Sequence, residues 1–175
     1  MKELLQIPIN NFSCTKDLSV QHFLTDLAIK YEEKNKTRTY LILNEDELNN
    51  NKIIIILGYF SIALQVLEIP DTTSKTKIKK IDGLSSSRHD ELILTHPVYL
   101  IGQIAKNDSC SVTIGKTIID MALDIIKTSQ GCVGGRIVLI ECEEKTKLIE
   151  FYNTSGFEIL QKDKNDRMLQ LIYYI

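Results

Sequence analysis

The segment Tyr99–Gly115, with the sequence YLIGQIAKNDSCSVTIG, organises the rest of the chain. Tyr99–Ala105 is apolar and predicts a strand, and the polar residues after it predict a loop. A helical pattern, KTIIDMALDIIK, follows Gly115, and Asp108 or Thr113 could start that helix. A loop that leads from a strand into a helix leaves backbone N–H groups unpaired at the positive end of the helix dipole, where phosphate binds. A phosphate site and a plain connection both remain open, because many parallel-sheet proteins contain such a segment.

The chain after this helix continues to alternate between strand and helix patterns. Arg136–Cys142 (RIVLIEC) contains a nearly continuous apolar run, which is typical of a strand buried on both faces of a parallel sheet. Lys145–Ser155 predicts a short helix with Tyr152 on its inner face. Tyr99–Ala105 and Arg136–Cys142 should form a parallel pair joined by one right-handed crossover helix.

The residues before the organising segment predict a mixture of elements. Leu4–Ile9 alternates loosely and predicts a short edge strand, whereas Val20–Tyr31 has the spacing of an amphipathic helix. Thr37–Leu43 and Ile53–Leu67 predict an antiparallel hairpin across a polar turn, the second strand being apolar on both faces. Pro70–His96 is long for a connection, so it is functional or mobile, or it holds a short helix.

The order of these elements resembles the GNAT family of acyl-CoA-dependent N-acetyltransferases. The most specific match is F-Y-x-x-x-G-F, formed by Phe151, Tyr152, Gly156 and Phe157. Upstream, FSCTKDLSVQHFLTDLAIKYEEKNKTRTYLI and ILGYFSIALQVLEIP resemble the opening helix and following strands of the branch that includes the acetyltransferase toxins, which modify the amino acid on charged tRNA. The resemblance covers residues 12–159.

The loop departs most from the family pattern, which usually reads Gln/Arg-x-x-Gly-x-Gly/Ala. Cys110, Thr113 and Gly115 stand at those positions, so only the last glycine is kept. The resemblance implies an α/β fold with a central mixed sheet of six or seven strands flanked by three or four helices. The length of 175 residues favours a single domain over residues 1–175.

The resemblance also implies where acetyl-CoA binds. The parallel pair would splay apart at its C-terminal end, and the pantetheine arm would bond to the first strand while the pyrophosphate would bond to N–H groups of the loop. The expected cofactor-binding residues are Gly102, Gln103, Ile104 and Ala105 on the strand, and Cys110, Ser111, Val112, Thr113, Ile114, Gly115 and Lys116 in the loop.

In GNAT enzymes a tyrosine at the position of Tyr152 commonly donates a proton to the thiolate leaving group. Its helical spacing from Leu148 also fits a packing role, and the F-Y-x-x-x-G-F match favours the general acid. No general base is identifiable, although Glu141, Glu143 and Glu144 lie near the end of the second strand. Many family members carry an asparagine near the position of Lys145, which leaves that cofactor contact open.

The resemblance predicts an acetyl-CoA-dependent N-acetyltransferase that acts on a primary amine by direct attack. Two alternatives stay open. A toxin acetylating the amino acid on charged tRNA is supported by the opening helix and by a lysine cluster, and a catalytically inactive acyl-CoA-binding or interaction module is supported by the divergent loop. A homodimer and an antitoxin partner are further expectations. The lysine cluster consists of Lys75, Lys77, Lys79 and Lys80.

The composition excludes several classes of protein. The net charge of −2 gives no overall attraction to nucleic acid or anionic membranes. The four cysteines lack C-x-x-C spacing, and His89 and His96 lack metal-ligand spacing, so neither a zinc site nor a disulfide framework is expected. The longest apolar run, Ile53–Ile69, is interrupted by polar residues, and no export signal is evident. We therefore expect a cytoplasmic protein without a metal.

Overall fold

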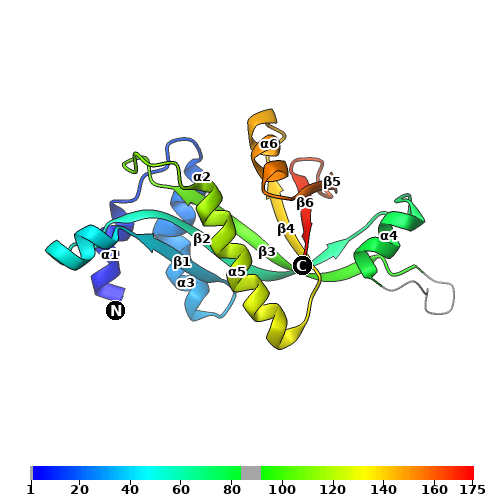
Figure 1. The fold of residues 1–175 in the computed structure, drawn as a ribbon, viewed down its shortest axis with the longest axis horizontal. Coiled ribbons are helices and arrows are strands. Elements are labelled where there is room, and N and C mark those ends of the chain that lie inside the picture. The colour runs from blue at the N-terminus through cyan, green and yellow to red at the C-terminus, as the bar shows by residue number, and fades with distance from the viewer. Residues whose placement is uncertain (1, 84–91) are drawn as a thin grey trace. The chain divides into compact units, whose positions relative to one another are not determined.

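The computed structural model describes residues 2–83 and 92–175, so His89 lies outside the described part of the chain. Six strands form one mixed sheet in the order β1-β2-β3-β4-β6-β5, with helices beside it (Figure 1). The pairs β1–β2, β4–β6 and β5–β6 are antiparallel, and β3–β4 is parallel. This confirms the α/β prediction. The strands are β1 (Arg38–Leu43), β2 (Ile56–Glu68), β3 (Thr95–Lys106), β4 (Ile137–Cys142), β5 (Glu158–Lys162) and β6 (Leu169–Tyr174).

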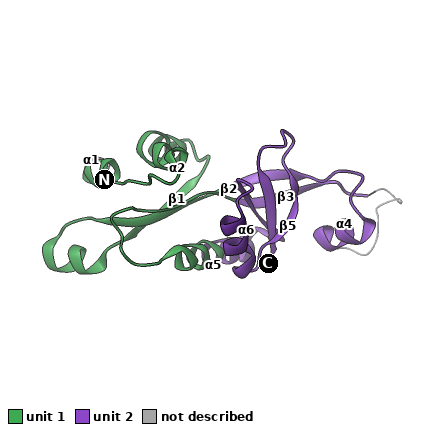
Figure 2. Ribbon diagram, turned by 90° about the horizontal axis from the view of Figure 1, so that it is seen from above, with its two compact units in different colours: residues 1–63, 101–123 green, residues 64–100, 124–175 purple. Residues whose placement is uncertain are grey.

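The chain forms two compact units, coloured separately in Figure 2. Unit 1 contains residues 1–63 and 101–123, and unit 2 contains residues 64–100 and 124–175. All three boundaries between the units fall inside regular elements, because β2, β3 and α5 (Gly115–Val133) each contribute residues to both units. The two units are described separately below.

The first element of unit 1 is a helix, α1 (Lys2–Asn10), and the predicted edge strand at Leu4–Ile9 is wrong. So short an apolar run fits both the two-residue repeat of a strand and the 3.6-residue repeat of a helix. Tertiary packing selects the helix here, because Leu5 and Ile9, four residues apart, both contact the core of this unit. The helix even contains Pro8, which removes one backbone hydrogen bond.

The predicted amphipathic helix is present as three consecutive pieces, α2 (Leu18–His22), the π-helical turn η1 (Phe23–Leu27) and α3 (Ala28–Glu33). Asp17 caps it by accepting a hydrogen bond from the Ser19 N–H at 2.9 Å. Phe23 packs its ring against Tyr59 of β2, and the two centroids are 6.4 Å apart. The helix therefore contributes to the same core as the first half of β2.

The predicted hairpin is confirmed by the antiparallel register of β1 and β2. Its turn contains the π-helical turn η2 (Glu47–Asn51) and ends at Lys52, which has a φ of 57°. The prediction that β2 is buried on both faces holds for Tyr59 and Phe60 in unit 1. In unit 2, Leu64 and Val66 are 75% and 61% exposed, so one face of that half meets solvent.

The long connection of unit 2 holds a helix, α4 (Lys75–Asp82), as one of its three interpretations predicted. The Ser74 hydroxyl caps its start, and Gly83 ends it with a φ of 78°. Ile78 and Ile81 bury its inner face among the residues of the core of unit 2. Amphipathic packing therefore fixes this segment.

The helices α5 and α6 (Thr146–Thr154) follow the strands β3 and β4, respectively, on which the acetyl-CoA site is predicted. The crossover helix α5 begins at Gly115, so neither Asp108 nor Thr113 is its first residue. Asp108 instead accepts hydrogen bonds from the Ser13 hydroxyl at 2.9 Å and the Thr15 N–H at 2.8 Å. These bonds lower the pKa of Asp108 below its ordinary value.

Candidate functional site

The parallel ladder between β3 and β4 is short. In the described residues its register joins Tyr99 to Val138 and Leu100 to Leu139. The strand β3 continues beyond these pairs to Lys106. The backbone groups of Gly102–Ala105, predicted to bond pantetheine, belong to this continuation of the strand.

Gln103 shows an unsatisfied acceptor on the same stretch of β3. Its side chain is half-buried, and its Oε1 atom is buried with no hydrogen-bond partner among the described residues. A buried acceptor without a donor costs free energy, so this position favours a ligand that brings an N–H group. Pantetheine carries amide N–H groups, and Gln103 therefore fits the cofactor that the sequence predicts.

The loop after β3 is held by a lysine that sequence reasoning missed. The Lys106 ammonium donates to the carbonyl oxygens of Cys110 at 2.6 Å and Val112 at 3.2 Å. A trans peptide points its N–H away from its C=O, and the described residues contain no cis peptide bond. The N–H groups of Ser111 and Thr113 therefore point away from Lys106.

The inner side of the loop is fixed by buried polar contacts. Asn107 is buried, and its amide donates to the Ile56 carbonyl at 2.8 Å and accepts from the Ser109 N–H at 3.1 Å. The Cys110 side chain is 5% exposed, and its thiol contacts the Val112 carbonyl. The buried Cys110 thiol therefore bonds to the backbone of the loop itself. The only sequence signal for Lys106 and Asn107 is a polar pair directly after an apolar strand.

The N–H groups at the mouth of α5 remain without partners. In the described residues, Ser111, Val112, Thr113 and Ile114 donate to no acceptor of the protein, and the first bond at the helix start runs from Ile118 to the Ile114 carbonyl. The first N–H groups of any helix lack an intrahelical acceptor, and the helix dipole adds partial positive charge there. Together these groups form a row of donors suited to an anion.

Gly58 of β2 sets how closely this helix start approaches the strand. A Cβ atom at Gly58 would lie 2.9 Å from both the Ala105 carbonyl oxygen and the Ile118 Cδ1 atom, and 3.3 Å from Ile114 Cδ1. No side chain larger than hydrogen fits without displacing one of these groups. The missing side chain at Gly58 thus allows Ile114 of the loop and Ile118 of α5 to pack closely against β2.

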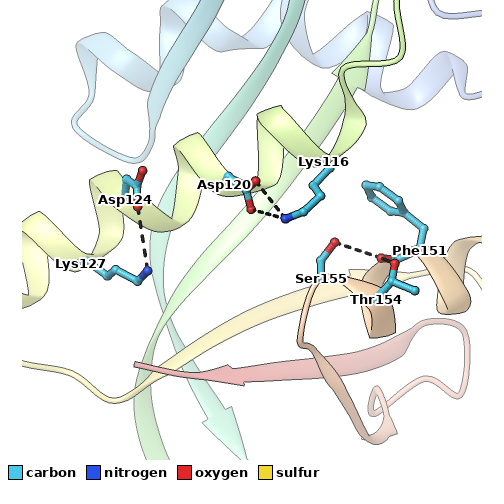
Figure 3. A network of polar contacts seen from close by, with 7 residues as sticks. All are labelled: Lys116, Asp120, Asp124, Lys127, Phe151, Thr154 and Ser155. Atoms are coloured by element: carbon cyan, nitrogen blue, oxygen red, sulfur yellow. Dashed lines mark hydrogen bonds and ion pairs between the residues drawn. The ribbon is translucent and has the colours of Figure 1, made fainter.

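The side chain of Lys116 is engaged on the surface of α5. Its ammonium bonds both carboxylate oxygens of Asp120, at 2.9 Å and 3.0 Å, as Figure 3 shows. The pair is exposed, so it contributes little to stability. Any role of Lys116 in anion binding therefore falls first to its backbone N–H.

Tyr152 lies on α6, and it is buried, with 7% of its surface exposed. Its ring packs between Phe151 and Phe157, at centroid distances of 5.3 Å and 6.0 Å. The hydroxyls of the other two buried tyrosines donate hydrogen bonds within the protein, Tyr59 to the Val20 carbonyl and Tyr99 to the Gly134 carbonyl. In the described residues, the Tyr152 hydroxyl has no hydrogen-bond partner.

The surroundings of Tyr152 keep its phenol protonated. Burial raises the pKa of Tyr152, and the neighbouring Cys142 thiol raises this pKa further. The C-terminal turn of α6 is fixed by two hydrogen bonds to the Phe151 carbonyl, from Thr154 at 2.8 Å and from Ser155 at 3.0 Å (Figure 3). The hydroxyl therefore keeps a proton that it can donate, and its raised pKa makes it a weaker acid than an ordinary phenol.

The three glutamates after the second parallel strand differ in their environments. Glu143 pairs with Lys145, and Glu144 pairs with Lys162 at 3.1 Å. Glu141 is half-buried and accepts a hydrogen bond from the Gln170 amide at 2.7 Å. Glu141 is therefore the one of the three that is bonded by a side chain of β6, the strand paired with β4.

The lysine cluster of α4 is partly neutralised by unit 2 itself. Lys77 donates to the Ile159 carbonyl at 3.0 Å, and Lys80 pairs with Glu158 at 3.1 Å. Lys80 also lies 4.1 Å from the centroid of the Tyr174 ring. These contacts tie α4 to the β5–β6 hairpin, which gives two of the four lysines a structural role.

Two negative findings concern the described part of the chain. It contains no group of three or more His, Cys, Asp or Glu side chains that could hold a metal ion. None of its helices combines the length and the apolar character that crossing a membrane requires. His96 is buried and bonds to the Ile93 carbonyl at 3.0 Å.

No protein-family model and no curated protein matches this chain. Among the solved structures that it resembles, a tyrosine-to-phenylalanine mutant of KacT has 20% identity over 95% of this chain and 86% of that chain, with a TM-score of 0.71. AtaT complexed with acetyl-methionyl-tRNAfMet has 20% identity over 92% and 85%, with a TM-score of 0.69. An AtaT mutant toxin bound to acetyl-CoA and the C-terminus of the antitoxin AtaR has 17% identity over 95% and 85%, with a TM-score of 0.66. At 20% identity or less, these likenesses bear on the fold alone, and they confirm the predicted α/β fold with a central mixed sheet.

Proposed function

We propose that this protein is an acetyl-CoA-dependent N-acetyltransferase that transfers an acetyl group to a primary amine. The observation that carries the proposal is the row of unpaired N–H groups from Ser111 to Ile114, of which those of Ser111 and Thr113 point away from Lys106. A pyrophosphate is the anion that this row fits. The unsatisfied Gln103 acceptor and the acetyl-CoA bound by a similarly folded toxin support the same cofactor.

The reaction follows from the groups on the strand and on α6. A neutral amine attacks the thioester carbonyl carbon, a C–N bond forms and the C–S bond breaks. The departing thiolate takes the phenol proton of Tyr152, and the amine proton is lost to a base or to solvent. Holding both reactants in register supplies much of the rate. The backbone of Gly102, Gln103, Ile104 and Ala105 would hold the pantetheine arm, and that of Cys110, Ser111, Val112, Thr113, Ile114, Gly115 and Lys116 would hold the pyrophosphate.

A second candidate acceptor is the amino acid on charged tRNA. It is favoured by the fold similarity to AtaT complexed with acetyl-methionyl-tRNAfMet, and an antitoxin partner would accompany it, as for AtaT. The lysine cluster gives this candidate less support than its four charges suggest, because Lys77 and Lys80 are engaged within unit 2. Purified protein with radiolabelled acetyl-CoA, offered aminoacyl-tRNA and small amines in parallel, separates the two acceptors. Transfer to neither would favour the inactive binding module.

Binding of acetyl-CoA tests the proposal directly. We expect calorimetry to show binding to the purified protein and Gly115→Val to weaken it by roughly 10-fold or more, because a branched side chain at the helix mouth blocks close approach of the phosphate. Circular dichroism should show that the variant is folded. Absence of binding by the wild-type protein at millimolar acetyl-CoA would contradict the proposal.

We call the two hydrogen bonds from the Lys106 ammonium to the Cys110 and Val112 carbonyls the Lys106 clamp, and its role in acetyl-CoA binding can be tested separately. Lys106→Met should weaken acetyl-CoA binding by about 10-fold, because charged hydrogen bonds of roughly 1.5–3 kcal/mol no longer hold the two loop carbonyls inward. Lys116→Met is the matched control, since it removes the same charge from an exposed side chain paired with Asp120. Equal losses in both variants would mean that charge alone matters, and the clamp would have no role.

A further inference from the structure

Unit 2 contains a polar cavity that no step above uses. It has a volume of about 270 Å³, and its walls come from the end of β2, from β4 and from the β5–β6 hairpin. This volume lies just below the usual range of roughly 300–1,000 Å³ for ligand pockets, so it suits a small ligand. Three carboxylates line it, those of Glu68, Glu141 and Asp163, together with the ammonium of Lys164.

A chain of hydrogen bonds fixes the floor of this cavity. Gln161 donates from Nε2 to the Glu68 backbone carbonyl at 2.8 Å and to Gln170 Oε1 at 2.7 Å. Gln170, which is 8% exposed, donates in turn to Glu141 Oε1 at 2.7 Å. A backbone carbonyl can only accept, so the Gln161 nitrogen must face it, and the direction of every bond in the chain is determined.

The chain of bonds leaves acceptors without donors. Both hydrogens of the Gln161 amide are used, and its Oε1 atom is buried with no partner among the described residues. Glu141 accepts through Oε1, and its second oxygen has no bond of this kind in the described structure. Lys164, the one cation among the lining residues, pairs with Glu68 at 2.7 Å. A ligand of this cavity must therefore bring N–H donors and positive charge.

The oxygen acceptors that line the cavity favour an ammonium over a metal ion. The three carboxylates do not converge as ligands, since no metal-holding group occurs in residues 2–83 and 92–175. A primary ammonium carries three N–H donors and one charge, which matches two open acceptors within a negatively charged cavity. Carboxylates also repel phosphate, so a small amine suits the cavity better than a nucleic-acid backbone does.

We infer that this cavity binds the primary ammonium of a small amine, and that this amine is the acetyl acceptor once it has lost one proton to solvent. The second half of the inference rests on the function proposed above. Glu141 supplies the countercharge, and Gln161 supplies the neutral acceptor that orients the group. Gln170 is a positioning residue, because it acts on the ligand through Glu141.

The test uses 1,4-diaminobutane as the probe and 1-butanol as its uncharged control, each titrated into the full chain by calorimetry. We expect the diamine to bind and the alcohol not to bind. Glu141→Gln should raise the dissociation constant of the diamine at least 10-fold and leave that of acetyl-CoA unchanged. Glu150→Gln, at an exposed position of α6, removes the same charge and should change neither constant.

A second variant fills the cavity without touching the chain of bonds. Gln65→Lys places a tethered ammonium among the lining residues and should abolish diamine binding in a folded protein. Diamine binding that survives both variants would overturn the inference, and so would binding of Mg²⁺ alone at Glu141. Diamine binding that depends on Glu141 in a protein that fails to bind acetyl-CoA would preserve the amine site and remove the proposed function. Acetyl-CoA binding without any amine binding would overturn the amine site and leave the proposed function in place.

Discussion

Replacing Tyr152 with phenylalanine should lower the turnover number by roughly 10²–10⁴-fold, which is the contribution of a positioned general acid. The Tyr152 hydroxyl has no hydrogen-bond partner in the described protein, so its removal breaks no internal bond. The ring contacts with Phe151 and Phe157 remain. We therefore expect acetyl-CoA affinity and melting temperature to stay close to wild type. Turnover, affinity and thermal stability should be measured on one preparation.

Tyr59→Phe is the matched control for this experiment. Tyr59 is also buried, but its hydroxyl donates to the Val20 carbonyl in the core of unit 1. Its removal should lower the free energy of unfolding by about 1 kcal/mol, the typical net worth of such a bond, and leave turnover nearly unchanged. If Tyr152→Phe stays within a few-fold of wild type in turnover, Tyr152 is a packing residue and water protonates the thiolate.

A pH profile of turnover tests the same assignment. Burial raises the pKa of Tyr152 above the ordinary value of about 10, so its phenol keeps its proton throughout the neutral and mildly alkaline range. The turnover of the wild-type enzyme should rise with pH as the amine loses its proton. No decline attributable to Tyr152 should occur below about pH 10.

The second large effect is expected at Gly58. Gly58→Val should lower the free energy of unfolding by about 3 kcal/mol, at the upper end for overpacking, and the melting temperature by roughly 6–12 °C. The Ala105 carbonyl belongs to the backbone and cannot move aside, so Ile114 and Ile118 must shift instead. Because Ile114 belongs to the loop, acetyl-CoA affinity should fall as well. Thermal denaturation and calorimetry together measure both effects.

Gly131→Ala provides the comparison. Gly131 lies within α5, and a Cβ atom there meets nothing within 4 Å. The substitution should stabilise the protein by about 0.5–1 kcal/mol, because alanine is the better helix former. A Gly58→Val protein as stable as wild type would show that α5 does not pack closely on β2.

The sequence predicts most strands and helices of this fold because their apolar residues follow a clear period. β4 is a nearly continuous apolar run interrupted by Glu141, and Val20–Tyr31 repeats at helical spacing. The helix at Leu4–Ile9 was not predicted, since the contact of Ile9 with a distant core decides between two periods that fit equally well. Local pattern therefore fails where tertiary packing selects the conformation.

The candidate site divides along the same line. The loop is predicted by the strand–loop–helix pattern and Tyr152 by the F-Y-x-x-x-G-F match, and both signals lie along the chain. The Lys106 clamp and the Gln161–Gln170–Glu141 chain depend on which side chains face each other across turns and strands. A single sequence contains no pairing register, so neither arrangement could be read from it.

The shared elements of the two units determine how this protein can be dissected. Residues 1–63 need 101–123 to complete their unit, and 64–100 need 124–175. No single cut in the gene yields either unit as one continuous fragment, and a cut at any boundary would sever β2, β3 or α5. Amine binding and anion binding therefore cannot be assigned by truncation. Point substitutions in the whole chain are the way to separate them.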